Sequence, residues 1–180
     1  MNLKTFKDGD HNLHQVDTMA TCDCCGQTLY YEVTLSIGLA DTLRVIVEEI
    51  KAKGINIVNT RKELYDLGKI TLTQYNNMTH LARLGMLANV NDEVGNYCLT
   101  AKAIKFLRGE PVPKGALVKK SSSLQHSNTA FTTEETTTLK DIYKAGGYWE
   151  VPGFDIREGR VIKAEPGAQG QLFKVNRTIY

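Results

Sequence analysis

The stretch KITLTQYNNMTHLARLGMLANVNDEVGNYCLT, residues 69–100, is the part of the sequence that decides the fold. Thr71 and Gln74 have the spacing of a capping box, which predicts a helix that begins there and ends at Gly85. Three residues at helical spacing would face inward from this helix: Tyr75, Met78 and Ala82.

The same stretch continues into a predicted β-hairpin. Residues 86–90 have the apolar content of a short strand, and residues 91–96 are rich in Asn, Asp and Gly, which favour turns. Residues 97–99 would return as the partner strand. The pattern therefore predicts a helix followed directly by two antiparallel strands.

The flanking sequence predicts three more helices and one more strand. A face of Leu and Ile residues predicts a helix that ends at Gly54, and the β-branched residues 55–58 predict a short strand. Thr60 and Glu63 are spaced as a second reciprocal capping pair, for a helix that ends at Gly68. Thr100 is the expected N-cap of a last helix that is closed by Gly109.

This order of helices and strands resembles the winged helix-turn-helix superfamily over residues 36–109. The residues that carry the resemblance are the turn Gly68-Lys69-Ile70, residues 81–87 leading into the hairpin, and residues 97–100 leading out of it. The resemblance implies an α+β fold class, with a winged helix domain over residues 35–109.

The resemblance also implies a double-stranded DNA-binding transcription regulator, with the helix at residues 71–85 in the major groove. The residues expected to read bases are Thr73, Asn76, Asn77 and His80. The residues expected to hold phosphates are Arg61, Lys62, Lys69, Lys102, Lys105 and Arg108. Asn can pair with adenine and Thr can meet a thymine methyl group, but a solvated helix face has the same composition.

The expected hairpin tip departs from the DNA-binding pattern. It contains Asp92 and Glu93 and no Lys or Arg, so it would repel a phosphate backbone. The alternative is a protein-interaction module, an inhibitor or adaptor that uses this acidic tip to bind a partner protein. Residues 100–120, with six Lys and Arg and one acid, could replace a basic wing. In either case a homodimer is expected.

Residues 1–34 contain a cysteine cluster of the kind that binds zinc. Cys22 and Cys25 form a C-x-x-C pair followed by glycine, similar to a zinc knuckle. His11 and His14 could complete a structural Cys2His2 zinc site, with Cys24 as a bystander. Ordinary reduced thiols and a redox pair are the alternatives. The fourth cysteine, Cys98, is expected in the core.

Composition divides the rest of the chain into a predicted linker and a predicted C-terminal unit. Proline and serine residues predict a linker over residues 110–132. Residues 133–180 are expected to form a small α+β unit, with a helix that Thr132 and Glu135 cap and strands at residues 148–151 and 172–175. A hairpin is predicted around residues 157–160, and Trp149 is expected to anchor this unit.

Composition and missing motifs exclude several classes of function. The chain has 180 residues, a net charge of +2 and 42% hydrophobic residues, without a run long enough to cross a membrane. Clustered cysteines suit a reducing compartment, so a cytoplasmic location is expected. No nucleophile, phosphate-loop or zinc-protease motif occurs, and no enzyme is expected. The combination resembles small accessory proteins of bacteria and their phages.

Overall fold

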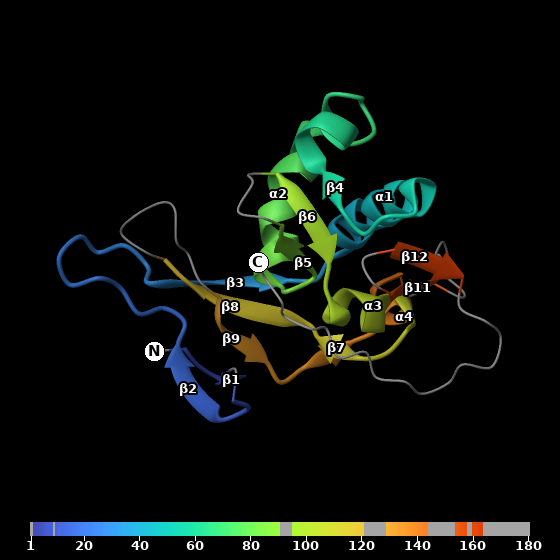
Figure 1. The fold of residues 1–180 in the computed structure, drawn as a ribbon. Helices are drawn as coiled ribbons and strands as arrows, with labels where there is room; N and C mark the ends of the chain where they lie inside the picture. Colours follow the sequence, from blue (N-terminus) through green and yellow to red (C-terminus); the bar gives the residue numbers. More distant parts are fainter. Residues whose placement is uncertain are drawn as a thin grey trace.

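The described part of the chain combines helices with antiparallel sheets, which confirms the predicted α+β class. The computed structural model describes residues 2–8, 10–90, 95–120, 129–143, 154–157 and 160–163. In Figure 1 the two long helices, α1 and α2, lie above the largest sheet, whose edge strands β1 and β2 are at the bottom of the view.

Residues 37–107 form a group of helices around a small sheet. In chain order, its elements are α1 (Ile37–Lys53), β4 (Val58–Asn59), the short π-helix η1 (Thr60–Tyr65), α2 (Leu72–Arg83), β5 (Leu87–Asn89), β6 (Asn96–Leu99) and α3 (Ala101–Leu107). The three strands are antiparallel and lie in the order β4-β6-β5. The predicted hairpin is thus confirmed as β5 and β6.

The predicted end of α1 at Gly54 and the predicted start of α2 at Thr71 are confirmed. Gly54 ends α1 in the left-handed conformation, with φ of 69°, and its N–H donates to the Ile50 carbonyl. At the start of α2, the Thr71 hydroxyl accepts from the Gln74 amide at 3.2 Å, and the Gln74 side chain accepts from the Thr71 amide at 2.9 Å. Met78, which was predicted to face inward from this helix, is buried.

The predicted cap of η1 is wrong by one residue. Asn59 is the N-cap and accepts from the Lys62 amide at 2.8 Å, while Glu63 accepts from the Asn59 amide at 2.8 Å. Thr60 is buried instead, and its hydroxyl donates to the Gly95 carbonyl at 3.2 Å. Asn and Thr are both good N-caps, so their order in the sequence does not identify which one serves. The strand predicted at residues 55–58 is also shorter, because β4 begins at Val58.

A second sheet joins strands from the N-terminal residues to strands that follow the helices in the sequence. Its strands, in spatial order, are β2 (Leu13–Asp17), β1 (Leu3–Lys7), β9 (Thr129–Thr133), β8 (Gly115–Lys119) and β3 (Tyr30–Thr34). Every pair in this sheet is antiparallel.

The linker predicted for residues 110–132 is wrong where the structure describes it. Residues 115–119 form β8, in which Ala116, Leu117 and Val118 are buried. Pro113 lies in β7 (Val112–Pro113), which pairs only with β10 (Thr136–Thr137), an edge position that proline tolerates. The prolines and serines on either side of residues 116–118 predict a loop, and this apolar run is too short to predict a strand against them. Residues 121–128 lie outside the described part.

One hydrophobic core connects the helices to this sheet. Its buried members include Val33 of β3, Ile46 of α1, Met78 of α2, Phe106 of α3, Val118 of β8 and Leu139. Because side chains alternate along a strand, Leu117 faces away from this core, on the opposite face of the sheet. No described helix is long and apolar enough to span a bilayer.

The C-terminal predictions have mixed outcomes. Helix α4 (Leu139–Tyr143) begins after Thr138, whose hydroxyl accepts from the Asp141 amide at 3.1 Å, so the predicted cap pair Thr132 and Glu135 is wrong. Thr132 belongs to β9 because it pairs with Lys7. The hairpin is confirmed as β11 (Phe154–Arg157) and β12 (Arg160–Lys163). Trp149 and the strands predicted at residues 148–151 and 172–175 lie outside the described residues.

Candidate functional sites

The residues expected to read bases lie along one face of α2. Thr73 and Asn76 are exposed, and Asn77 and His80 are partly buried. Their spacing is that of a single helical stripe, so α2 brings all four together. Thr79 is also exposed beside them, although no pattern in the sequence points to it.

His80 is the least accessible member of this stripe. Its Nδ1 atom is buried without a hydrogen-bond partner among the described residues. Burial, followed by the positive charge of Arg83, lowers the pKa of His80. The ring therefore stays neutral at neutral pH and offers one donor or acceptor, not a cation.

The cations near η1 already have partners within the protein. The Arg61 guanidinium lies 4.8 Å from the centre of the Tyr65 ring, and its Nε is 2.9 Å from Asp66. Lys69 forms an ion pair with Glu49, whereas Lys62 is exposed. Both pairs lie near the surface, where such contacts contribute little and can exchange.

Lys102 does not lie among the exposed cations as expected. Its ammonium group donates to the Leu84 carbonyl at 2.7 Å, at the C-terminal end of α2. Burial lowers the pKa of Lys102 to about 8. Lys105 and Arg108, on the same helix α3, are exposed. Lys102 thus stabilises the end of α2 and is not placed to meet phosphates.

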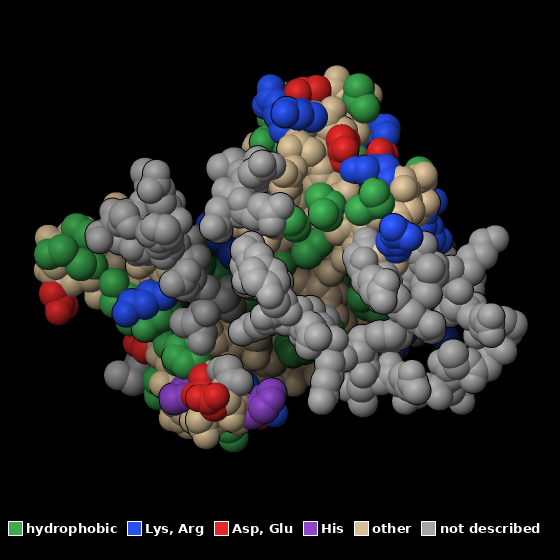
Figure 2. All heavy atoms as spheres, in the orientation of Figure 1, with side chains coloured by type: hydrophobic (Ala, Val, Ile, Leu, Met, Phe, Trp, Pro, Cys, Tyr) green, Lys and Arg blue, Asp and Glu red, His purple; other side chains and the backbone are tan. Residues whose placement is uncertain are grey.

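The expected phosphate contacts fall into two groups. Figure 1 shows η1 and α3 at opposite ends of the small sheet that contains β6. Figure 2 shows Lys and Arg side chains next to Asp and Glu side chains at the end of the molecule that carries η1. The charge there is mixed, and the acidic tip with Asp92 and Glu93 lies outside the described residues.

A tight loop between β2 and β3 carries the cysteine cluster. Thr21 and Thr28 form a β-bridge, and inside it the Cys22 amide donates to the Gln27 carbonyl at 2.8 Å. Gly26 closes the turn with φ of 70°, a conformation that favours glycine, and its amide donates to the Cys22 carbonyl at 2.8 Å.

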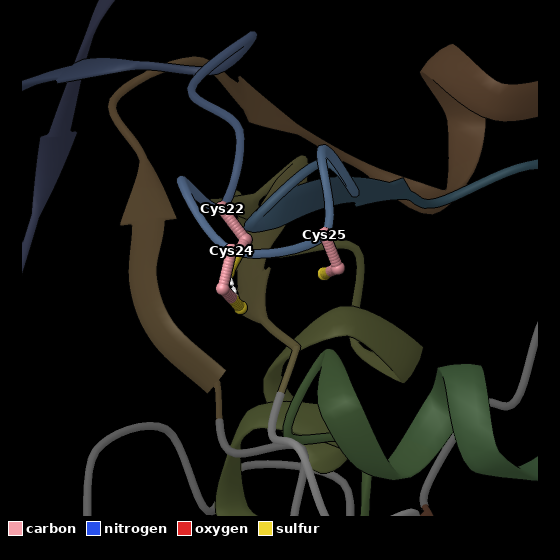
Figure 3. A group of neighbouring side chains, drawn as sticks. All are labelled: Cys22, Cys24 and Cys25. Carbon is pink, nitrogen blue, oxygen red and sulfur yellow. Dashed lines mark hydrogen bonds between the residues drawn. The ribbon is translucent and has the colours of Figure 1, made fainter.

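This turn brings three thiols together. The sulfur atoms of Cys22, Cys24 and Cys25 all lie within 4.8 Å of one another, close enough to hold a metal ion. Figure 3 shows the three side chains extending from the same side of the loop. Cys24 was expected to be a bystander, and that expectation is wrong because its sulfur lies 2.9 Å from that of Cys22.

The contacts within the loop make the Cys22 thiol more acidic than the Cys24 thiol. The hydrogen bond from the Cys24 thiol, followed by those from the Cys24 and Cys25 amides, lowers the pKa of Cys22 to about 7. The same sulfur–sulfur contact raises the pKa of Cys24. A thiolate, which is the form that binds metals, is therefore readily available at Cys22.

The two histidines expected to complete the site are not part of it. In the described residues, the three cysteines form the only group of three or more His, Cys, Asp or Glu side chains that could hold an ion. The Nε2 atom of His14 lies 2.8 Å from Asp8, and the ring packs against Phe131. His11 lies in the turn between β1 and β2, with φ of 67°.

Cys98 lies apart from the cluster, in β6. It is partly buried, and burial raises its pKa, so it remains a thiol at neutral pH. The sequence signal for the group of Cys22, Cys24 and Cys25 is that three cysteines lie within four positions, because a single turn can then bring their sulfur atoms close together.

No protein-family model, curated protein or solved structure matches this chain, so the geometry of these two sites carries the argument about function.

Proposed function

We propose that residues 36–109 bind double-stranded DNA as a transcription regulator of winged-helix type. What supports this proposal is the order of α1, β4, η1, α2, β5 and β6, together with the strand order β4-β6-β5. The same order of elements is what the sequence resemblance implies. Apart from Leu72 in its first turn, the exposed residues of α2 are polar: Thr73, Asn76 and Thr79.

In this proposal α2 enters the major groove. Thr73, Asn76 and Asn77 make the contacts to bases, and neutral His80 supplies at most one hydrogen bond. The proposed phosphate contacts are Lys62, Lys69, Lys105 and Arg108. Arg61, which stacks on the Tyr65 ring, would contact phosphate only after leaving that ring. Lys102 instead acts as a positioning residue, because it holds the C-terminal end of α2. A homodimer would place two such helices one turn of DNA apart.

The second candidate is a protein-interaction module that inhibits or redirects a partner. The observation that favours it is the internal pairing of cations: Lys102 with Leu84, Lys69 with Glu49, and Arg61 with Asp66. Fewer free cations predict weaker DNA binding that is less sensitive to salt. The acidic tip with Asp92 and Glu93 would then be the docking surface.

A charge-reversal experiment distinguishes the two candidates. We expect the protein to be retained on mixed genomic DNA fragments at low salt, and we expect Lys62→Glu with Lys105→Glu to abolish retention. The matched control is Lys4→Glu with Lys140→Glu, which changes the net charge equally at exposed positions of β1 and α4. Absence of retention at roughly 50 mM salt, or equal loss in both double variants, contradicts the DNA-binding proposal.

We further propose that the ion held by the cysteine loop is Zn²⁺ in a structural role. Soft thiolate ligands favour zinc among the common divalent ions, and this loop has few apolar contacts that would hold it otherwise. Reduced thiols require a reducing compartment, so the proposal includes a cytoplasmic location.

A further inference from the structure

We infer that Cys22, Cys24 and Cys25 bind a single Zn²⁺ ion as its only protein ligands, and that the fourth coordination position takes an exchangeable soft ligand such as a small thiol. This inference rests on the zinc proposed above and replaces the Cys2His2 ligand set that the sequence suggested. It differs from a closed structural site in leaving one position open.

The spacing of the sulfur atoms suits one ion. Zinc–sulfur bonds of about 2.3 Å in a tetrahedron place neighbouring sulfur atoms about 3.8 Å apart. In the structure the Cys22 and Cys24 sulfur atoms are 2.9 Å apart, and no two sulfur atoms of the group are more than 4.8 Å apart. Small rotations of two exposed side chains are enough to bring all three sulfur atoms onto one ion.

The backbone of the loop is already shaped for this arrangement. The bridge between Thr21 and Thr28 and the two backbone hydrogen bonds within the turn place residues 22–26 in one tight turn. Because the ligands occupy one turn, binding orders few additional residues.

The described structure offers no fourth donor to the ion. Asp23 lies within the same turn, yet it does not belong to the group of ligand atoms within 4.8 Å. His14 is engaged with Asp8 at 2.8 Å and its ring lies against Phe131, while Cys98 belongs to β6. A zinc ion with three protein ligands characteristically keeps water or another ligand in the fourth position.

The open position faces solvent. Cys24 and Cys25 are exposed, and the loop that carries them projects from the end of the molecule away from the helices (Figure 1). A ligand can therefore reach the ion without any movement of the core.

Charge determines what kind of ligand this position prefers. Three thiolates outweigh the charge of Zn²⁺, so the bound water is only weakly acidified and hydrolytic chemistry is disfavoured. Exchange of water for a polarisable sulfur ligand requires no redox step and involves only loss of the thiol proton to solvent. The loop is thus suited to ligand exchange on the metal.

The ligand set is tested by Co²⁺ titration of the full chain under a phosphine reductant, with Zn²⁺ displacement. We expect one ion per chain and a sulfur-to-cobalt absorption band. Cys24→Ser should remove roughly a third of that band and weaken binding at least tenfold. Cys25→Ser should act alike, whereas Cys98→Ser and His14→Gln should change neither quantity.

The open position is tested by adding 2-mercaptoethanol to the 1:1 cobalt complex. We expect the sulfur-to-cobalt band to grow and the ligand-field bands to shift. No spectral response overturns the inference, as does loss of binding in His14→Gln, an unchanged band in Cys24→Ser, or one ion shared by two chains. Those outcomes leave the zinc proposal intact, whereas absence of any Zn²⁺ or Co²⁺ binding overturns both.

Discussion

Lys102 shows how one buried contact changes the role of a residue. Its composition and position suit a phosphate contact, but its ammonium group donates to the Leu84 carbonyl at 2.7 Å. That carbonyl belongs to the C-cap of α2, where a helix carries partial negative charge. The lysine therefore fixes the end of the helix that is proposed to contact DNA.

Titration of Lys102 gives a prediction at the residue scale. Burial lowers its pKa to about 8 in the folded protein, against about 10.4 in the unfolded chain. Between these values the unfolded chain binds more protons, so the free energy of unfolding should rise with pH. We expect wild type to gain stability over Lys102→Met between pH 8 and pH 10 in urea titrations.

The control for this titration is Lys105→Met, on the exposed side of the same helix. It removes a lysine from α3 but leaves the contact of Lys102 with the Leu84 carbonyl in place. A pH-independent difference between wild type and Lys102→Met would mean that the Lys102 ammonium group is not desolvated in the folded protein.

At the scale of elements, the sequence predicts a helix best where a capping residue and an apolar face indicate the same segment. Helix α2 has the Thr71–Gln74 capping pair and a buried face, and α1 has a buried face and the terminal Gly54, and both helices are confirmed. The caps at Asn59 and Thr138 were missed because other Thr residues with the same spacing lie nearby. Local pattern cannot rank such alternatives, since the packing of distant strands decides between them.

The cysteine site follows the same logic. The C-x-x-C spacing correctly drew attention to Cys22 and Cys25, and the sulfur atoms of both belong to the group. The exclusion of His14 depends on how β1 pairs with β2, because that pairing places His14 opposite Phe6. Such a register cannot be read from the loop sequence.

Asn56 provides a prediction for the small sheet. It precedes β4, is 8% exposed, and its side chain bonds both the amide of Leu99, at 2.9 Å, and its carbonyl, at 3.1 Å. Asn56→Ala leaves both backbone groups buried without these partners. We therefore expect a loss of about 2–4 kcal/mol in the free energy of unfolding, measured with urea.

Asn89→Ala is the matched control, because Asn89 is exposed on β5 of the same sheet. It should change the free energy of unfolding by less than about 0.5 kcal/mol. Equal effects of the two substitutions would show that the Asn56 contact with β6 contributes nothing beyond an ordinary surface asparagine.

At the scale of the whole molecule, the sheet and the helices are parts of one core. Val33 and Val118 come from segments that composition alone separated from the helical residues, yet both pack in the same cluster as Ile46 and Met78. Proline and serine content predicts loops, but it does not predict which strands pair when they are more than a hundred residues apart in the sequence. The long pairing of β1 with β9 in particular joins chain segments that no local pattern connects.

A shared core predicts that the described helices and the five-stranded sheet unfold together. Val118→Ala in β8 removes two buried methyl groups from a residue with 0% exposure, so it should cost about 2 kcal/mol. Amide hydrogen exchange should then accelerate by a similar factor in α1, α2 and β8, because the slowest amides in all three exchange through global opening.

The control is Val16→Ala, in the edge strand β2, which should have a small effect because Val16 is partly exposed. Acceleration confined to the sheet, with α1 and α2 still protected, would show instead that the helical residues form an independently stable domain.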